Sequence, residues 1–262
     1  MNILLATDFS SVNKTLVSYA LDLLRDTGGC IILFHAYLPS GNNTAVEHAM
    51  QENVNTLQSM IREQRLDNIV LDKQLLTGKP EETLLASAQV KNADLILMGT
   101  RGRGNKRFLE GSLSKSLMDK SPIPLLSIHE DYHYRESKEV LYVTNFNHSD
   151  VKNISRVTEI LRPFHPHLHI VHFLMDGDPV KASRSMNELE ASLKYLDTGA
   201  TLTYKMVYAT NAHDAMKVYC DDNDISLAAF VPRRRRFFDL FFKDTVSKND
   251  FYDLHIPLLT FI

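Results

Sequence analysis

The sequence has few cysteines and no long hydrophobic run, and each absence excludes a class of protein. Only Cys30 and Cys220 occur among 262 residues, so the chain is not a small secreted scaffold held together by disulfides. No apolar run approaches the roughly 20 residues that a membrane span requires. Residues 2–6 form a strand-like pattern where a signal peptide would carry basic residues. We therefore expect a cytoplasmic protein that does not bind membranes.

The chain also lacks an excess of charge and a recognisable catalytic motif. Its 29 basic and 32 acidic side chains give a formal net charge of −3, which argues against a nucleic-acid partner. There is no nucleophile elbow, no cysteine beside a plausible base and no carboxylate pair at a defined spacing. The sequence does not indicate an enzyme.

What the sequence does contain is an internal repeat. Four apolar segments of the first half recur in the second half in the same order. The pairs are residues 3–10 and 140–147, 31–36 and 168–173 (both offset by 137), 94–97 and 224–227 (offset by 130), and 123–128 and 256–261 (offset by 133). Loop insertions and deletions explain the drift, so we predict a tandem duplication. The predicted domains are 1–132 and 138–262, with a short polar join over 130–138.

Within each half, apolar runs of about five residues alternate with longer amphipathic runs, which is typical of βαβ units. In the first half the pattern predicts helices over 12–24 and 45–63 and a third helix from Pro80, with strands over 69–75 and 94–98. Gly28 and Gly29 are expected to end the first helix. The pattern favours an α/β fold with a mostly parallel sheet.

A glycine-containing loop spans residues 98–113, directly after the strand predicted over 94–98. Glycines let backbone N–H groups turn inward around an anion, and a helix beginning near 111–112 would add its unpaired N–H groups and positive dipole end. The loop also carries four cationic side chains, namely Arg101, Arg103, Lys106 and Arg107. This combination predicts a phosphate-binding loop.

The loop resembles the nucleotide motif of the universal stress protein family, which is Gly-x-x-Gly, a gap of nine residues, and Gly-Ser/Thr. The matching and flanking residues are Met98, Gly99, Gly102, Gly111, Ser112 and Leu113. The resemblance extends over nearly the whole chain, twice. It implies two tandem open five-stranded parallel-sheet domains, Rossmann-like and adenine nucleotide alpha hydrolase-like. It also implies an internal pseudo-dimer through the strands at Leu125 and Leu258.

By resemblance, the ligand is ATP or AMP, with or without Mg²⁺, and it binds to the first domain only. The implied site residues are Thr7, Asp8, Ala36, Met98, Gly99, Arg101, Gly102, Gly104, Gly111, Ser112 and Leu113. Adenine would lie near the first three, and the phosphates on the backbone of 102–104 and 111–113. Ser112 would be the hydroxyl nearest the phosphates, so weak ATP hydrolysis or autophosphorylation is the most activity that we expect. Asp8 would serve equally well as a turn or helix-cap residue.

The loop departs from the family pattern at one point, because eight residues rather than nine separate Gly102 from Gly111. Three consequences of the shorter loop stay open: it tightens without effect on binding, it narrows the nucleotide site, or it removes nucleotide binding.

The function implied by the resemblance is that of a stress-response protein that binds an adenine nucleotide and signals through conformational change. The alternative is a non-nucleotide-binding interaction scaffold with an unknown protein partner. A homodimer of the whole chain stays open.

The second half is predicted to have a degenerate loop. The alignment places Ala229 opposite Gly99, Pro232 opposite Gly102, Asp244–Thr245 opposite Gly111–Ser112, and Asn145 opposite Asp8. Proline donates no N–H, and aspartate would repel a phosphate. The run Arg233–Arg236 would grip phosphates, an acidic partner or a membrane surface, or else form a solvated loop whose neighbouring phenylalanines fill the core. We favour the solvated loop.

Histidines are the remaining candidates for a site. His35 and His172 lie at matching strand ends, and we interpret both as structural. His165, His167 and His169 join His172 in a cluster, in which strand alternation would put 167 and 169 on one face. No cysteine or acid lies at ligand spacing along this stretch, so we predict no metal site.

Overall fold

The computed structural model describes residues 1–9, 13–38, 43–99, 116–117, 120–129, 132–175, 177–231, 254 and 256–261. The chain forms two compact units, the first made of Met1–Tyr134 with Thr260–Ile262 and the second of Arg135–Leu259. Among the described residues, no helix is both long and apolar enough to cross a membrane. The domain limits 1–132 and 138–262 and the pseudo-dimer stay predictions.

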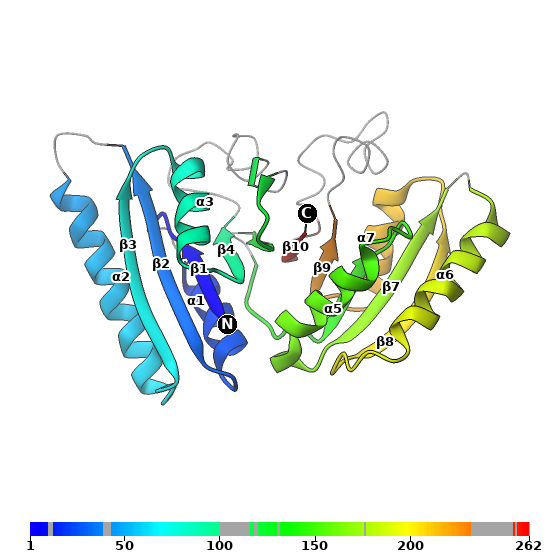
Figure 1. Cartoon of the computed structure of the whole chain (residues 1–262), viewed down its shortest axis with the longest axis horizontal. Helices are drawn as coiled ribbons and strands as arrows, with labels where there is room; N and C mark the ends of the chain where they lie inside the picture. The colour runs from blue at the N-terminus through cyan, green and yellow to red at the C-terminus, as the bar shows by residue number, and fades with distance from the viewer. Residues whose placement is uncertain are drawn as a thin grey trace. The chain divides into compact units, whose positions relative to one another are not determined.

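The first unit is an open parallel sheet with a helix between β1 and β2, between β2 and β3, and between β3 and β4 (Figure 1). Its strands follow the order β3-β2-β1-β4-β5, and all neighbouring pairs are parallel. The elements are β1 (Asn2–Ala6), α1 (Asn13–Leu24), β2 (Gly29–Tyr37), α2 (Thr44–Glu63), β3 (Ile69–Thr77), α3 (Pro80–Val90), β4 (Leu95–Gly99) and β5 (Leu125–Ile128). These bounds confirm the α/β prediction.

The second unit repeats this architecture. Its strand order is β10-β9-β6-β7-β8, in which β10 contributes Leu258 and Leu259 to this unit, and the pairs β6–β7, β6–β9 and β7–β8 are parallel. The elements are β6 (Glu139–Val143), α5 (Asp150–Ile160), the 3-10 turn η1 (Arg162–Phe164), β7 (His167–Leu174), α6 (Pro179–Leu193), β8 (Thr201–Tyr208), α7 (Ala212–Asp222), β9 (Leu227–Phe230) and β10 (Leu258–Thr260).

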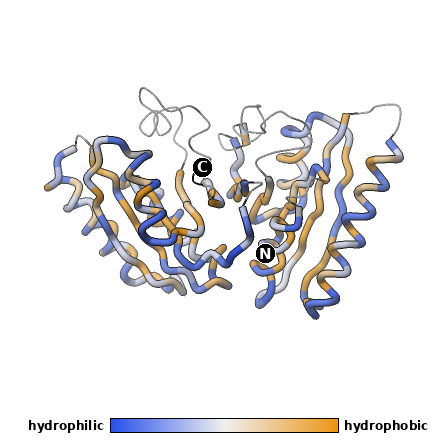
Figure 2. The backbone as a smooth tube through the Cα atoms, turned by 180° about the vertical axis from the view of Figure 1, so that it is seen from behind, coloured by the Kyte–Doolittle hydropathy of each residue, from blue (hydrophilic) through white to orange (hydrophobic). Residues whose placement is uncertain are grey.

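The core of each unit lies around its central strand. Ile3, Leu4 and Leu5 of β1 have no exposed surface, and the same is true of Val140 and Leu141 in β6. Parallel strands covered on both faces are apolar at successive positions rather than at alternate ones. In Figure 2 much of the tube in the sheet is orange (hydrophobic), whereas the long outer helices alternate between blue and orange along their length.

Strand register tests how the two halves align. Asn2 pairs with Cys30 in the first unit, and Glu139 pairs with His167 in the second. Both members of the second pair lie 137 residues after their counterparts, so the predicted offset of 137 is confirmed for these strands. Hydrogen bonds from the amides of Ile96 and Ala228 to the carbonyl oxygens of Pro124 and Pro257 likewise support the offset of 133 for the last strands.

The alignment of β4 with β9 was predicted wrongly. Leu95 pairs with Ile3, and Leu227 pairs with the equivalent residue Val140. The offset is therefore 132 (227 minus 95), not 130. This register places Val231, rather than Ala229, opposite Gly99.

The turn before each strand explains the error. Asn92 and Asp224 both adopt a left-handed conformation with φ of 48°. The residues that follow them donate their amides back into the preceding helix, to Ala88 and Cys220 respectively. Asp224 is thus the counterpart of Asn92 in the turn. The sequence alignment instead pairs Asp224 with Asp94 of the first half, because both residues are aspartates that precede an apolar run.

The two cysteines differ in burial, which predicts different reactivity. Cys220 lies in the core of the second unit, and burial raises the pKa of its thiol to about 12. Cys30 is half-buried, and burial raises its pKa as well. Since only the thiolate reacts, iodoacetamide at pH 8 is expected to label Cys30 slowly and Cys220 only after unfolding. Mass spectrometry of native and urea-treated protein measures both, with Cys30→Ser as the control. Equal labelling of both native thiols would contradict this burial.

Candidate functional site

The strand order of the first unit reverses at β1. From β1 the chain passes to β2 and β3 on one side, whereas β4 and β5 lie on the other side. Ala6 pairs with both Phe34 and Met98, so the residues after these positions emerge together at the carboxyl ends of three adjacent strands. Open α/β sheets bind their ligands at such a point of reversal.

Five of the predicted site residues are at this edge of the sheet. Thr7 and Asp8 follow β1, Ala36 lies near the end of β2, and Met98 and Gly99 end β4. Thr7 and Met98 are buried, whereas the other three are half-buried. The remaining predicted site residues lie outside the described residues, namely Arg101, Gly102, Gly104, Gly111, Ser112 and Leu113. The same holds for Arg103, Lys106, Arg107, Pro232, the run Arg233–Arg236, and Asp244–Thr245.

The end of β1 is joined to β2 by contacts of Thr7, Phe9 and His35. We call these three residues the strand-end clasp. The Thr7 amide donates to the Phe34 carbonyl oxygen at 2.9 Å, and the Phe9 amide donates to Thr7 Oγ1 at 3.0 Å. His35 Nδ1 donates to the Thr7 carbonyl oxygen at 2.7 Å. The rings of Phe9 and His35 pack with their centroids 4.4 Å apart. These contacts hold Phe9 at a φ of 62°, which costs a bulky residue about 1–3 kcal/mol.

The second unit has the same clasp, formed by Thr144, Phe146 and His172. The Thr144 amide donates to the Val171 carbonyl oxygen at 2.9 Å, and the Phe146 amide donates to Thr144 Oγ1 at 3.0 Å. His172 Nδ1 lies 2.9 Å from the Thr144 carbonyl oxygen, and its ring centroid lies 4.5 Å from that of Phe146. Both matching histidines therefore contact the backbone, as expected for structural residues.

A buried carboxylate distinguishes the second unit. Asp150, the first residue of α5, is 1% exposed. One carboxylate oxygen accepts from Thr144 Oγ1 at 2.6 Å and from the Asn147 amide at 2.9 Å, and the other accepts from the Tyr142 hydroxyl at 3.0 Å. Burial and the neighbouring charge of Asp150 raise the pKa of Tyr142. At the offset of 137 the first unit has Asn13, an amide in place of the carboxylate, at this position in the sequence.

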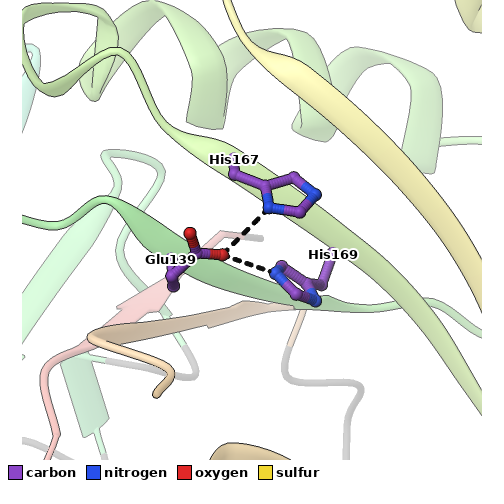
Figure 3. A group of neighbouring side chains, drawn as sticks. All are labelled: Glu139, His167 and His169. Carbon is purple, nitrogen blue, oxygen red and sulfur yellow. Dashed lines mark hydrogen bonds and ion pairs between the residues drawn. The ribbon is translucent and has the colours of Figure 1, made fainter. Parts of the chain in front are cut away.

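A second polar group in this unit was missed from the sequence. Glu139, His167 and His169 converge at the amino ends of β6 and β7, and we call them the Glu-His-His cluster (Figure 3). No acid lies at ligand spacing along the sequence near these histidines, but the pairing of β6 with β7 brings Glu139 to them. Glu139 lies 28 residues before His167 in sequence but is its register partner in the sheet. Pairing the residues that directly precede the predicted segments 140–147 and 168–173 would have revealed it.

The three side chains of the cluster differ in burial, and burial affects the pKa of His169. The His169 side chain is 6% exposed, whereas those of His167 and Glu139 are 33% and 37% exposed. Burial lowers the pKa of His169, the hydrogen bond to Glu139 opposes this shift, and the ammonium group of Lys205 acts in the same direction as burial. The net effect favours a neutral imidazole at position 169.

Comparison with known proteins agrees with this architecture. The family model described as "Universal stress protein family" matches residues 1–129. The "Universal stress protein in QAH/OAS sulfhydrylase 3'region" of Thermus aquaticus is 32% identical over 134 residues, which is 48% of this chain and 96% of that protein. The chain belongs to the universal stress protein family. Stress response protein NhaX of Bacillus subtilis is 25% identical over 159 residues, covering 48% of this chain and 96% of that protein.

Solved structures match the whole chain. A universal stress protein from Archaeoglobus fulgidus covers 99% of this chain and 95% of its own, with a TM-score of 0.69 at 17% identity. The cytoplasmic domain of a prokaryotic cation chloride cotransporter covers 99% of this chain and 94% of its own, with a TM-score of 0.61 at 12% identity. These likenesses show a tandem fold.

Other universal stress proteins were solved in complex with cAMP and with dAMP, at TM-scores of 0.31 and 0.37.

Proposed function

We propose that the first unit of this universal stress protein binds an adenine nucleotide, AMP or ATP with or without Mg²⁺, and signals by changing conformation in the cytoplasm. The observation that carries the proposal is the convergence of Thr7, Asp8, Ala36 and Gly99 where the strand order reverses. Ligands of open α/β sheets bind at this position. The cAMP and dAMP complexes make adenine nucleotides the ligand class within the family to test first.

Each described residue has a chemical role in this proposal. The Asp8 carboxylate accepts hydrogen bonds from ribose hydroxyls, and the backbone of Ala36 contacts the adenine edge. Thr7 is fixed by the strand-end clasp, so β1 presents Asp8 in a constant position. Gly99 ends β4 and leads into the sequence that carries Gly102 and Gly111. Phosphates would lie on the backbone N–H groups of that loop.

The second unit is proposed not to bind nucleotide. Asn145 stands at the position of Asp8, and Val231 stands at the position of Gly99. The sequence has no glycine after Gly199, so a close backbone approach to phosphates is disfavoured there. One nucleotide per chain is the expected stoichiometry.

The alternative is an interaction scaffold that binds no nucleotide and serves an unknown protein partner. The observation that favours it is the gap of eight residues between Gly102 and Gly111, one fewer than the family pattern. Nucleotide binding separates the two functions directly.

Calorimetry with AMP and with ATP plus Mg²⁺ provides the test. The wild type is expected to bind one nucleotide, and the double variant Gly102→Asp with Gly111→Asp none. Asp8→Asn, which copies the second unit, is expected to weaken binding about ten-fold, as for a lost charge-assisted hydrogen bond. Asn145→Ala is the matched control and should bind as the wild type does.

Two results would overturn the proposal. Absence of saturable binding by the wild type would favour the scaffold, and two nucleotides per chain would show that the second unit also binds. Absorbance of nucleotide released on denaturation of freshly purified protein gives an independent measurement.

A further inference from the structure

The Glu-His-His cluster has the composition and spacing of a metal centre. One nitrogen from each of His167 and His169 and one oxygen from Glu139 all lie within 4.8 Å of one another. We infer that these three residues form a binding site for a divalent transition-metal ion of the zinc type in the second unit. The proposed nucleotide site plays no part in this inference.

The two imidazoles face the same carboxylate oxygen. Glu139 Oε2 lies 3.0 Å from His167 Nδ1 and 2.7 Å from His169 Nε2, as the dashed lines in Figure 3 mark. Ligand atoms around a tetrahedral zinc ion are about 3.3 Å apart, given bond lengths of about 2.0–2.1 Å. The two nitrogen–oxygen distances would therefore lengthen by a few tenths of an ångström on binding, and the two nitrogens already lie within 4.8 Å of each other.

The other nitrogen of each imidazole is held by a hydroxyl group. His169 Nδ1 lies 2.9 Å from the Tyr219 hydroxyl, and His167 Nε2 lies 3.2 Å from Thr203 Oγ1. Histidines that bind metals usually donate their second N–H to such a partner, which fixes the tautomer and aims the free nitrogen at the ion. Both histidines thus have the outer contacts of metal ligands.

The donor set selects the class of ion. Two imidazole nitrogens and one carboxylate oxygen suit Zn²⁺, Co²⁺ or Ni²⁺, whereas Mg²⁺ and Ca²⁺ prefer oxygen alone. His167 and Glu139 are about one-third exposed at their side chains, so water can complete the coordination. The ammonium group of Lys205, 5.4 Å from the centre of the Tyr219 ring, disfavours a cation, and the negative charge of Glu139 offsets it.

The cluster lies at the opposite end of its strands from the clasp. Glu139 and His167 are the first residues of β6 and β7, whereas Thr144 and His172 lie at the carboxyl ends. At the offset of 137 the first unit has Asn2, Cys30 and Ile32 in these places. That unit therefore offers no equivalent ligand set, and we expect one metal ion per chain.

Titration of the metal-stripped full-length chain with Co²⁺ or Zn²⁺ tests the inference. Calorimetry and the visible absorption of Co²⁺ report binding, and the melting temperature reports folding. The wild type is expected to bind one ion and to melt at a higher temperature when loaded. Glu139→Gln, which keeps the hydrogen-bonding shape, and His167→Asn at a half-exposed position are each expected to weaken binding at least about ten-fold.

The matched control is His165→Asn. His165 lies two residues before His167, is exposed and has a left-handed φ of 47°, which asparagine tolerates. This variant loses one histidine, as His167→Asn does, and should retain wild-type binding. The inference is overturned if the wild type binds no ion, or if Glu139→Gln and His167→Asn, folded as judged by melting, bind as tightly as His165→Asn.

Discussion

Replacing Asp150 with alanine is expected to destabilise the second unit by about 3–5 kcal/mol. The carboxylate is buried and accepts hydrogen bonds from the Tyr142 hydroxyl, the Thr144 hydroxyl and the Asn147 amide. Its removal leaves these donors without an acceptor, and α5 loses a negative charge at its N-terminus. Hydrogen exchange followed by mass spectrometry measures the effect because it reports each unit separately. Amides of β6 and α5 should exchange faster, and those of the first unit should not change.

Two further variants isolate the cause. Asp214→Ala removes an exposed aspartate from the first turn of α7 in the same unit, and its expected effect is within about 0.5 kcal/mol. Tyr142→Phe removes only one donor and is expected to cost about 1 kcal/mol. If Asp150→Ala and Asp214→Ala changed exchange equally, the buried network would contribute no stability.

Replacing Gly29 with alanine is expected to destabilise the first unit by about 3–5 kcal/mol. Gly29 begins β2 with a φ of 146°, and a Cβ atom there would overlap the carbonyl oxygen of Met1. That oxygen accepts the amide hydrogen bond of Cys30 at 3.1 Å. The substitution therefore forces β1 and β2 apart at their amino ends. Faster amide exchange in β1 and β2 is the expected measurement.

Gly199 is the matched control for this substitution. It also has a positive φ, of 60°, but its added Cβ would meet only the Arg162 side chain, at 3.6 Å or more. Gly199→Ala is therefore expected to lower the free energy of unfolding only by the cost of placing an alanine in the left-handed conformation, about 1–2 kcal/mol. If both variants lost a similar amount of unfolding free energy, the backbone around Met1 would have moved away from the added Cβ atom with little strain.

The fold could be predicted from the sequence because its strongest signals are local. Hydrophobic runs over residues 3–5 and 140–143 predicted the central strands, and the glycine pair after α1 predicted its end. Gly28 indeed donates its amide to the Leu24 carbonyl oxygen at 2.8 Å. The alignment of β4 with β9 failed because register is set by hydrogen bonds. The amide of Ser226 donates to the Glu139 carbonyl oxygen, and this hydrogen bond helps to set the register of β9 against β6. The residue types in the sequence do not show which amide pairs with that oxygen.

The candidate sites could be predicted only in part, for a different physical reason. Thr7 and Asp8 directly follow a strand and Gly99 ends one, so a sequence pattern finds them. The Glu-His-His cluster joins residues from two strands separated by α5, and Asp150 is surrounded by groups from β6 and the following turn. Such contacts depend on which strands are neighbours and which faces are buried. Neither property is encoded at a fixed sequence spacing.

The strand-end clasp tolerates different residues beside it. It has nearly the same geometry in both units, although Asp8 and Gly99 of one copy are Asn145 and Val231 in the other. Its hydrogen bonds involve backbone groups and residues of the strand ends, so they do not depend on the loops beyond. The residue that follows the threonine of the clasp can therefore differ, as Asp8 differs from Asn145, while the hydrogen bonds and the ring contact of the clasp stay the same. The strand ends thus form a fixed frame on which the neighbouring side chains differ between the two units.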